Sequence, residues 1–119
     1  MKRAIALTAV VSSLATLAVQ WALASAGVAA RVVLDNAKVV TTEVSYAPGS
    51  RREPGIRGHD QVIVFLDDCR YERTDSKTGE KTIRTRRAGE VIWHSKGEDA
   101  PLLVNLGSKP YRTIVVELK

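Results

Sequence analysis

Cysteine and histidine are scarce in this sequence of 119 residues, which contains one cysteine, Cys69, and two histidines, His59 and His94. A single thiol excludes a disulfide bond within the chain. Cys69 follows an apolar stretch and precedes an alternating one, so we expect a small buried side chain rather than a nucleophile. The two histidines are the only side chains that we expect to titrate near neutral pH.

Aromatic residues are also few, at 5% of the chain, and none is interleaved with the arginine clusters at residues 51–57 and 84–87. This composition argues against a nucleic-acid partner. We interpret the two clusters as solvated strand faces. Beyond residue 30 the chain holds 16 basic and 13 acidic residues, so the net charge of that part is 16 − 13 = +3.

The first thirty residues lack acidic side chains and are charged only at Lys2 and Arg3. A basic start, an apolar run and small residues at its end are typical of a secretory signal. Small-x-small cleavage motifs occur at residues 22–24, 24–26 and 28–30. We therefore expect residues 1–30 to form a signal helix that is removed on export to the periplasm or the exterior. The alternative is an uncleaved membrane anchor, since the run is long enough to span a bilayer.

Beyond residue 30, apolar residues recur with a period near two, and no segment shows a helical stripe. β-Branched residues are frequent in these segments, and glycine or proline separates them. Short strands at this spacing predict one all-β domain over residues 31–119, a sandwich or small barrel with the hairpin of 69–87 largely exposed. The predicted strands are residues 31–34, 38–46, 61–66, 69–75, 80–87, 90–94, 101–106 and 111–118, with loops at 51–60 and 96–100.

The segment from Gly49 to Asp68 resembles the first motif of the cupin family, G-x5-H-x-H-x3-E-x6-G. In that frame the closing glycine falls on Asp68, and the two histidines and the glutamate fall on Gly55, Arg57 and Gln61. Gly49 and the strand order therefore match the motif, whereas its closing glycine and its ligands do not.

The second cupin motif, G-x5-P-x-G-x2-H-x3-N, begins at Gly89 with a loop that is one residue longer. Gly97 and Asn105 match the motif, whereas its last histidine falls on Pro101. The resemblance covers residues 31–119 and implies a double-stranded β-helix, the jelly-roll barrel. It also implies a homodimer, because small cupins often pair through their sheets.

A cupin metal site presents three imidazoles and a carboxylate to a divalent ion. The four corresponding positions hold none of these groups: they are Gly55, Arg57, Gln61 and Pro101. Arg57 is a permanent cation that would repel a metal, so we expect no metal cofactor at the usual place. A relocated metal site built from His59 and His94, with Asp60 or Glu98, is the alternative.

If the barrel forms, Arg57 and Gln61 point where the metal ligands usually point. A guanidinium and an amide there could hold a carboxylate or a phosphate by parallel hydrogen bonds. The alternative, which we slightly prefer, is that Arg57 turns out of its loop into solvent and the barrel is simply packed. For Trp93 and Tyr111 we expect core packing rather than stacking on a ligand. The candidate pocket residues are Arg57, Gln61, His59, His94, Trp93 and Asn105.

Three functions fit these observations. The first is an exported, non-catalytic module that binds a small anion or sugar. The second is a cupin-type oxygenase or isomerase whose site uses His59 and His94, the available groups for acid–base catalysis. The third is a dimeric interaction protein without a reaction. The missing ligands favour the binding module over a metalloenzyme.

Overall fold

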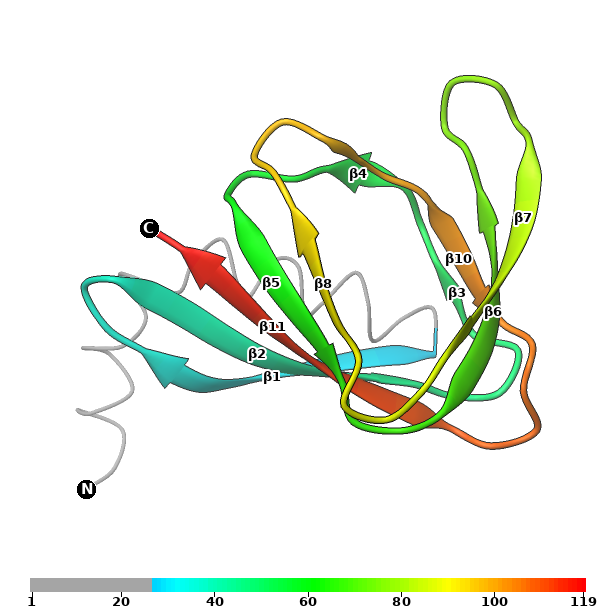
Figure 1. The fold of residues 1–119 in the computed structure, drawn as a ribbon, viewed down its shortest axis with the longest axis horizontal. Coiled ribbons are helices and arrows are strands. Elements are labelled where there is room, and N and C mark those ends of the chain that lie inside the picture. The colour runs from blue at the N-terminus through cyan, green and yellow to red at the C-terminus, as the bar shows by residue number, and fades with distance from the viewer. Residues whose placement is uncertain (1–26) are drawn as a thin grey trace.

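A computed structural model describes residues 27–119 of the chain (Figure 1). Residues 1–26 of the predicted signal helix, with the first two cleavage motifs, lie outside these residues, whereas its last three residues, 28–30, are the start of a strand. Every element of the described part is a strand, and none of its segments is a helix that could cross a membrane. The all-β prediction is therefore confirmed for this part of the chain.

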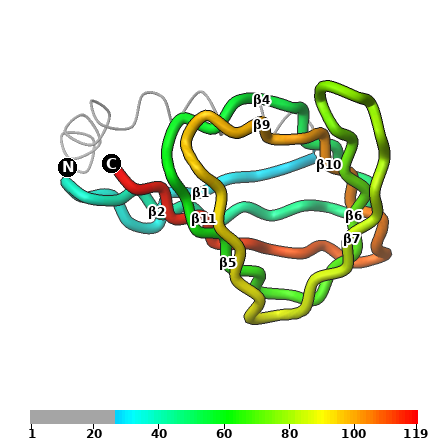
Figure 2. Tube along the Cα trace, turned by 45° about the horizontal axis from the view of Figure 1, so that its top comes forward, coloured from blue at the N-terminus to red at the C-terminus, as the bar shows by residue number. Residues whose placement is uncertain are grey.

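Two antiparallel sheets face each other and enclose the interior of a barrel (Figures 1 and 2). The larger sheet has five strands in the order β1-β2-β11-β5-β8: β1 (Val28–Asp35), β2 (Val39–Tyr46), β11 (Tyr111–Leu118), β5 (Gln61–Phe65) and β8 (Val91–His94). The smaller sheet has the order β3-β10-β6-β7: β3 (Arg51–Arg52), β10 (Leu102–Asn105), β6 (Cys69–Thr74) and β7 (Lys81–Arg86). A two-stranded pair closes one end, β4 (Gly55–Ile56) with β9 (Asp99–Ala100).

Alternation along the strands decides which side chains enter the barrel. In β5, Gln61, Ile63 and Phe65 are buried, whereas the two valines between them are half-buried on the outer face. In β6, Tyr71 is buried, whereas β7 is mostly exposed, so the predicted exposure of this hairpin holds for its second strand only. This is the period-two pattern of a sheet that buries one face.

Three short strands and the start of β1 differ from the sequence-based prediction. The predicted loop 51–60 contains β3 and β4, and the predicted loop 96–100 contains β9. Gly55 pairs with Ala100 and Ile56 with Asp99. Two-residue strands show no periodicity, which is why the pattern missed them. β1 begins at Val28, three residues before the predicted start at Arg31.

Aromatic side chains form the core at one end of the barrel. The rings of Tyr46 and Tyr111 stack with centroids 4.6 Å apart, and Tyr71 lies 6.3 Å from Tyr111. Phe65 extends the stack, with its centroid 6.3 Å from that of Tyr71. Val28, which is fully buried, belongs to the same cluster. Because this cluster occupies one end only, the other end of the barrel is not filled.

Candidate functional site

A cavity of about 1050 Å³ occupies the interior of the barrel between the two sheets. Its aromatic wall is the core cluster, including Tyr46, Phe65 and Tyr111. Polar side chains line its other end, where β4 and β9 pair. Since β5 runs from Gln61 to Phe65, the polar and aromatic ends are separated by roughly 13 Å, four residues at the usual strand rise. The size is typical of a pocket for a small organic molecule.

The four residues at the positions of the metal ligands in the cupin motifs all line this cavity. Gly55 lies in β4, Gln61 begins β5, and Arg57 and Pro101 follow β4 and β9. The cavity is therefore built where the motif places it, with different chemistry at its polar end.

Arg57 is buried, with only 8% of its surface exposed, so the preferred alternative of a solvent-facing Arg57 in a packed barrel is wrong. The main-chain N–H of Arg57 donates to the carbonyl of Glu98, and its carbonyl accepts from Gly97, which fixes the loop on the barrel. The side chain donates one hydrogen bond, from Nη1 to Oε1 of Gln61 at 2.9 Å. Its Nε is buried without a hydrogen-bond partner.

The surroundings of Arg57 are electrostatically unfavourable for a cation. Burial lowers the pKa of Arg57, and the nearby Arg52 lowers it further, against a smaller opposing effect from Glu98. The guanidinium still carries its charge at neutral pH, because arginine is not deprotonated in proteins. A buried cation with an unused donor is costly unless a partner satisfies it.

Positive charge predominates among the charged side chains that line the cavity. Its acids are Glu53 and Glu117. The cationic side chains are Arg52, Arg57, Arg73, Arg84, Arg86 and Lys119. Two of these cations are already engaged. Arg86 donates to Glu90 at 2.5 Å and lies 5.5 Å from the centre of the Phe65 ring, and Lys119 donates to Asp35 at 2.8 Å. The remaining excess gives the cavity an environment suited to an anion.

His59 and His94 both line the cavity but have separate acidic partners. His59 lies 3.9 Å from Glu117 and is half exposed. His94 is closer to an acid, with 3.1 Å between its Nδ1 and Oε1 of Glu98. Within residues 27–119, no three side chains of His, Cys, Asp or Glu gather to form a metal-binding group. The structure therefore does not assemble the relocated metal site that the sequence suggested.

Two of the candidate pocket residues, Trp93 and Asn105, do not line the cavity. Trp93 is 51% exposed and absent from the cavity lining, because Ile92 and His94 are the residues of β8 that point inward. The expectation of core packing is thus wrong for Trp93 and confirmed for Tyr111, which is 2% exposed. Asn105 is buried outside the cavity, with its amide bonded to main-chain groups.

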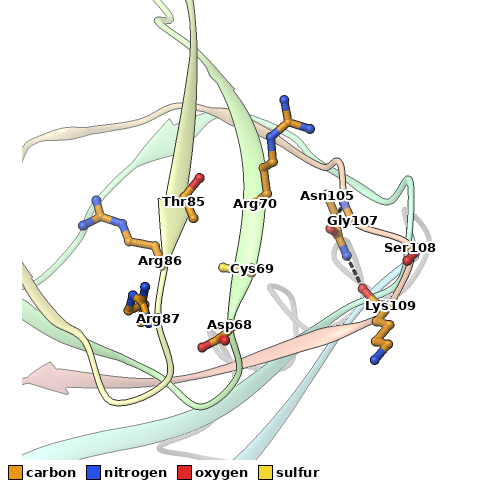
Figure 3. A pocket seen from close by; sticks show the side chains of 10 residues that line it. All are labelled: Asp68, Cys69, Arg70, Thr85, Arg86, Arg87, Asn105, Gly107, Ser108 and Lys109. Carbon is orange, nitrogen blue, oxygen red and sulfur yellow. Dashed lines mark hydrogen bonds between the residues drawn. The ribbon is translucent and has the colours of Figure 1, made fainter.

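A second, smaller pocket of about 410 Å³ lies beside Cys69 on the outside of the barrel. Figure 3 shows that Arg70, Arg86 and Lys109 point away from one another there, so they do not converge on a common ligand. Cys69 is half-buried, and burial raises the pKa of its thiol to about 11, which keeps it protonated and unreactive. The sequence-based view of Cys69 as a filler agrees with this position.

The described residues adopt the cupin fold. A cupin domain from Bordetella pertussis Tohama I superposes with a TM-score of 0.71 at 18% identity, covering 78% of this chain and 94% of that one. The polyketide cyclase RemF from Streptomyces resistomycificus gives a TM-score of 0.63 at 20% identity over 77% of this chain and 65% of its own. The predicted fold is confirmed by these superpositions.

An oxalate oxidase in complex with the substrate analogue glycolate is also similar, with a TM-score of 0.59 at 21% identity. The match covers 76% of this chain but 50% of the oxidase. No family model and no curated protein matches the sequence. These neighbours include enzymes as well as cupins described only by their fold. The structural similarity therefore defines the architecture, and the chemistry has to be inferred from the residues that line the cavity.

Proposed function

We propose that the protein is an exported cupin-like module that binds a small organic acid inside its barrel, with Arg57 as the anchor. The observation that carries this proposal is the buried Arg57 guanidinium, whose Nε has no hydrogen-bond partner although it lines a cavity of about 1050 Å³. A carboxylate beside Arg57 would accept that hydrogen bond and offset the repulsion from Arg52.

The other end of the cavity supports an acid with an apolar or aromatic tail. Tyr46, Phe65 and Tyr111 form a wall there, roughly 13 Å from the polar end along β5. Aromatic walls contribute most to binding when they contact a flat or apolar group. A cupin fold holding a small carboxylate has a parallel in the oxalate oxidase solved with glycolate. A phosphate could use the same guanidinium, so the experiment includes both anions.

Calorimetric titration tests this function. The ligands are phenylacetate, a sugar acid such as gluconate, and inorganic phosphate, with phenylacetamide as the neutral isostere of phenylacetate. We expect phenylacetate to bind, the amide not to bind, and Arg57→Ala and Arg57→Met to weaken binding by about 10- to 100-fold, as one charge-assisted hydrogen bond predicts. Arg70→Ala is the matched control, because Arg70 is exposed and does not line the cavity.

Two outcomes would remove the proposal. One is equal and negligible heat from the wild type and the Arg57 variants with all of these ligands. The other is undiminished binding of phenylacetate by Arg57→Met. Circular dichroism of each variant shows whether it has folded. We expect Arg57→Met to be at least as stable as the wild type, since it replaces a buried charge by an apolar chain of similar length.

A further inference from the structure

His94 stands next to the anchor for the acid. It ends β8, and its backbone partner in the sheet is Gln61 on β5. Both side chains line the cavity, and Gln61 accepts the hydrogen bond from Arg57. Two segments that are distant in the sequence thus bring a guanidinium, an amide and an imidazole to one end of the barrel.

Glu98 holds the ring of His94 from outside the cavity. Oε1 of Glu98 lies 3.1 Å from Nδ1, and Oε2 accepts the main-chain N–H of Ser95 at 2.9 Å. The hydrogen bond from Ser95, and then that from His94, lower the pKa of Glu98, so it is a carboxylate at neutral pH and can only accept. Nδ1 therefore carries the proton, and Nε2 keeps its lone pair. Among residues 27–119, no group hydrogen bonds to Nε2.

The charges around His94 keep the ring neutral near pH 7. Burial lowers its pKa, as do the nearby Arg57 and Arg52, while Glu98 opposes them. The other titratable groups along this part of the cavity are His59 and Glu117, which lie beside each other. A neutral imidazole with a free Nε2 is a base.

We propose that His94 is a general base that moves a proton on the bound acid, and that Glu98 is its positioning residue. This inference rests on the proposed function, because the acid must first be held by Arg57. The substrate class is a 2-oxo acid with an apolar or aromatic tail. Its carboxylate binds Arg57, its tail contacts the aromatic wall, and the carbon beyond the ketone lies toward His94.

The step needs no second reactant. Nε2 takes a proton from the carbon next to the ketone. The electron pair of that C–H bond forms a carbon–carbon double bond, and the π pair of the ketone moves onto its oxygen to give an enolate. The imidazolium then returns the proton to the carbon or to the enolate oxygen. The net reaction is a tautomerisation, with atoms and electrons unchanged in number and no oxidant or reductant.

Exchange of hydrogen for deuterium tests this step directly. Phenylpyruvate and pyruvate are incubated with the protein in D₂O, and proton NMR follows the loss of the signal from the carbon next to the ketone. We expect exchange above the rate in buffer, faster relative to that background with phenylpyruvate. His94→Gln should lower the enzymatic rate by about 100-fold or more, while binding of phenylpyruvate by calorimetry changes by less than about threefold.

Variants of the two neighbours distinguish a positioning role from a structural one. The rate should rise with pH through the pKa of His94. Glu98→Gln removes the group that raises this pKa, so it should shift the acid limb of the profile to lower pH as well as reduce the rate. Arg70→Ala is the control, because Arg70 is exposed and does not line the cavity, and its exchange rate should equal that of the wild type.

The experiments distinguish a failure of this inference from a failure of the proposed function. If the wild type binds phenylpyruvate through Arg57 but does not accelerate exchange, this inference is wrong and the proposed function stands. Undiminished exchange in His94→Gln, or an unshifted profile in Glu98→Gln, also overturns it. If the wild type binds none of the acids and accelerates no exchange, both proposals fail.

Discussion

At the scale of single residues, two buried polar side chains have opposite roles. The Nε of Arg57 has no hydrogen-bond partner, whereas the side-chain amide of Asn105 is fully hydrogen-bonded. Nδ2 of Asn105 donates to the carbonyls of Tyr46, Ala47 and Lys109 at 3.1, 3.3 and 3.1 Å. Its Oδ1 accepts the main-chain N–H of Gly107 at 2.8 Å. One side chain thus connects the end of β2 to the turn before β11.

Replacing Asn105 by alanine should therefore destabilise the whole domain. The change removes one buried and three half-buried hydrogen bonds to main-chain groups, which predicts a loss of about 2–4 kcal/mol in the free energy of unfolding. Urea denaturation followed by circular dichroism measures it. Asn36→Ala is the comparison, because the Asn36 side chain accepts two hydrogen bonds in an exposed turn and should cost less than half as much. Equal losses for both variants would contradict this role of Asn105.

The sequence indicated where Arg57 and Gln61 lie but could not indicate their surroundings. Their positions follow from motif spacing alone. The cavity beside them depends on which side chains fill the barrel. The lack of a partner for the Nε of Arg57 depends on the rotamer of that side chain. The pair of His94 and Glu98 had a sequence signal, a spacing of four residues. The orientation of the ring, which decides what this pair can do, cannot be inferred from the spacing.

At the scale of elements, the strands with a clear period were predicted and those without one were not. β2, β5 and β11 each have several residues of regular pattern, and the prediction placed them to within about a residue. β8 is four residues long, too short for its alternation to reveal that Trp93 is outside and His94 inside. In β1, an irregularity in the pairing with β2 between Val32 and Leu34 leaves Val33 and Leu34 exposed. Such a bulge breaks the period from which a strand is recognised.

The contacts of β1 favour two of the three predicted signal-cleavage positions over the third. Val28 is fully buried in the core, and the carbonyl of Gly27 accepts a hydrogen bond from Ala47 at 3.2 Å. Cleavage after Ala30 would remove both, whereas cleavage after Ala24 or Ala26 would keep them. We expect mass spectrometry of the exported protein to find an N-terminus at Ser25 or Gly27.

A comparison of two purified chains of different length tests the energetic basis of this prediction. A chain that starts at Arg31 should unfold more easily than one that starts at Gly27, by about 2–3 kcal/mol, because a buried valine and three paired residues are lost. Equal urea midpoints for the two chains would contradict this. An N-terminus at Met1 in membrane fractions would instead indicate the uncleaved anchor.

At the scale of the whole molecule, an apolar patch on the outer face of the larger sheet is where we propose that two copies pair. Its members are the outward residues of β8, β5 and β11, which lie side by side in the strand register: Val91, Trp93, Val62, Val64, Ile114 and Val116. Val91 is 58% exposed and Trp93 51%. The other four members are half-buried. A contiguous apolar patch with exposed large side chains is typical of a surface that binds another protein.

Sedimentation equilibrium tests this pairing. We expect the wild type to sediment as a dimer and Trp93→Glu to sediment as a monomer, because a charge in the paired patch would be buried without a partner. Arg70→Glu, on the other sheet, is the control and should remain a dimer. A monomeric wild type at high protein concentration would contradict the proposal, as would a dimer that Trp93→Glu leaves intact.

The position of β11 has a consequence for how the molecule folds. The last strand in the chain lies at the centre of the larger sheet, between β2 and β5, and the first strand reaches it only through β2 (Figure 1). While a ribosome is still making the chain, β2 and β5 have no strand between them. The barrel can therefore close only after residues 111–118 have emerged. Until then the β1–β2 hairpin and β5 lack the strand that joins them into one sheet.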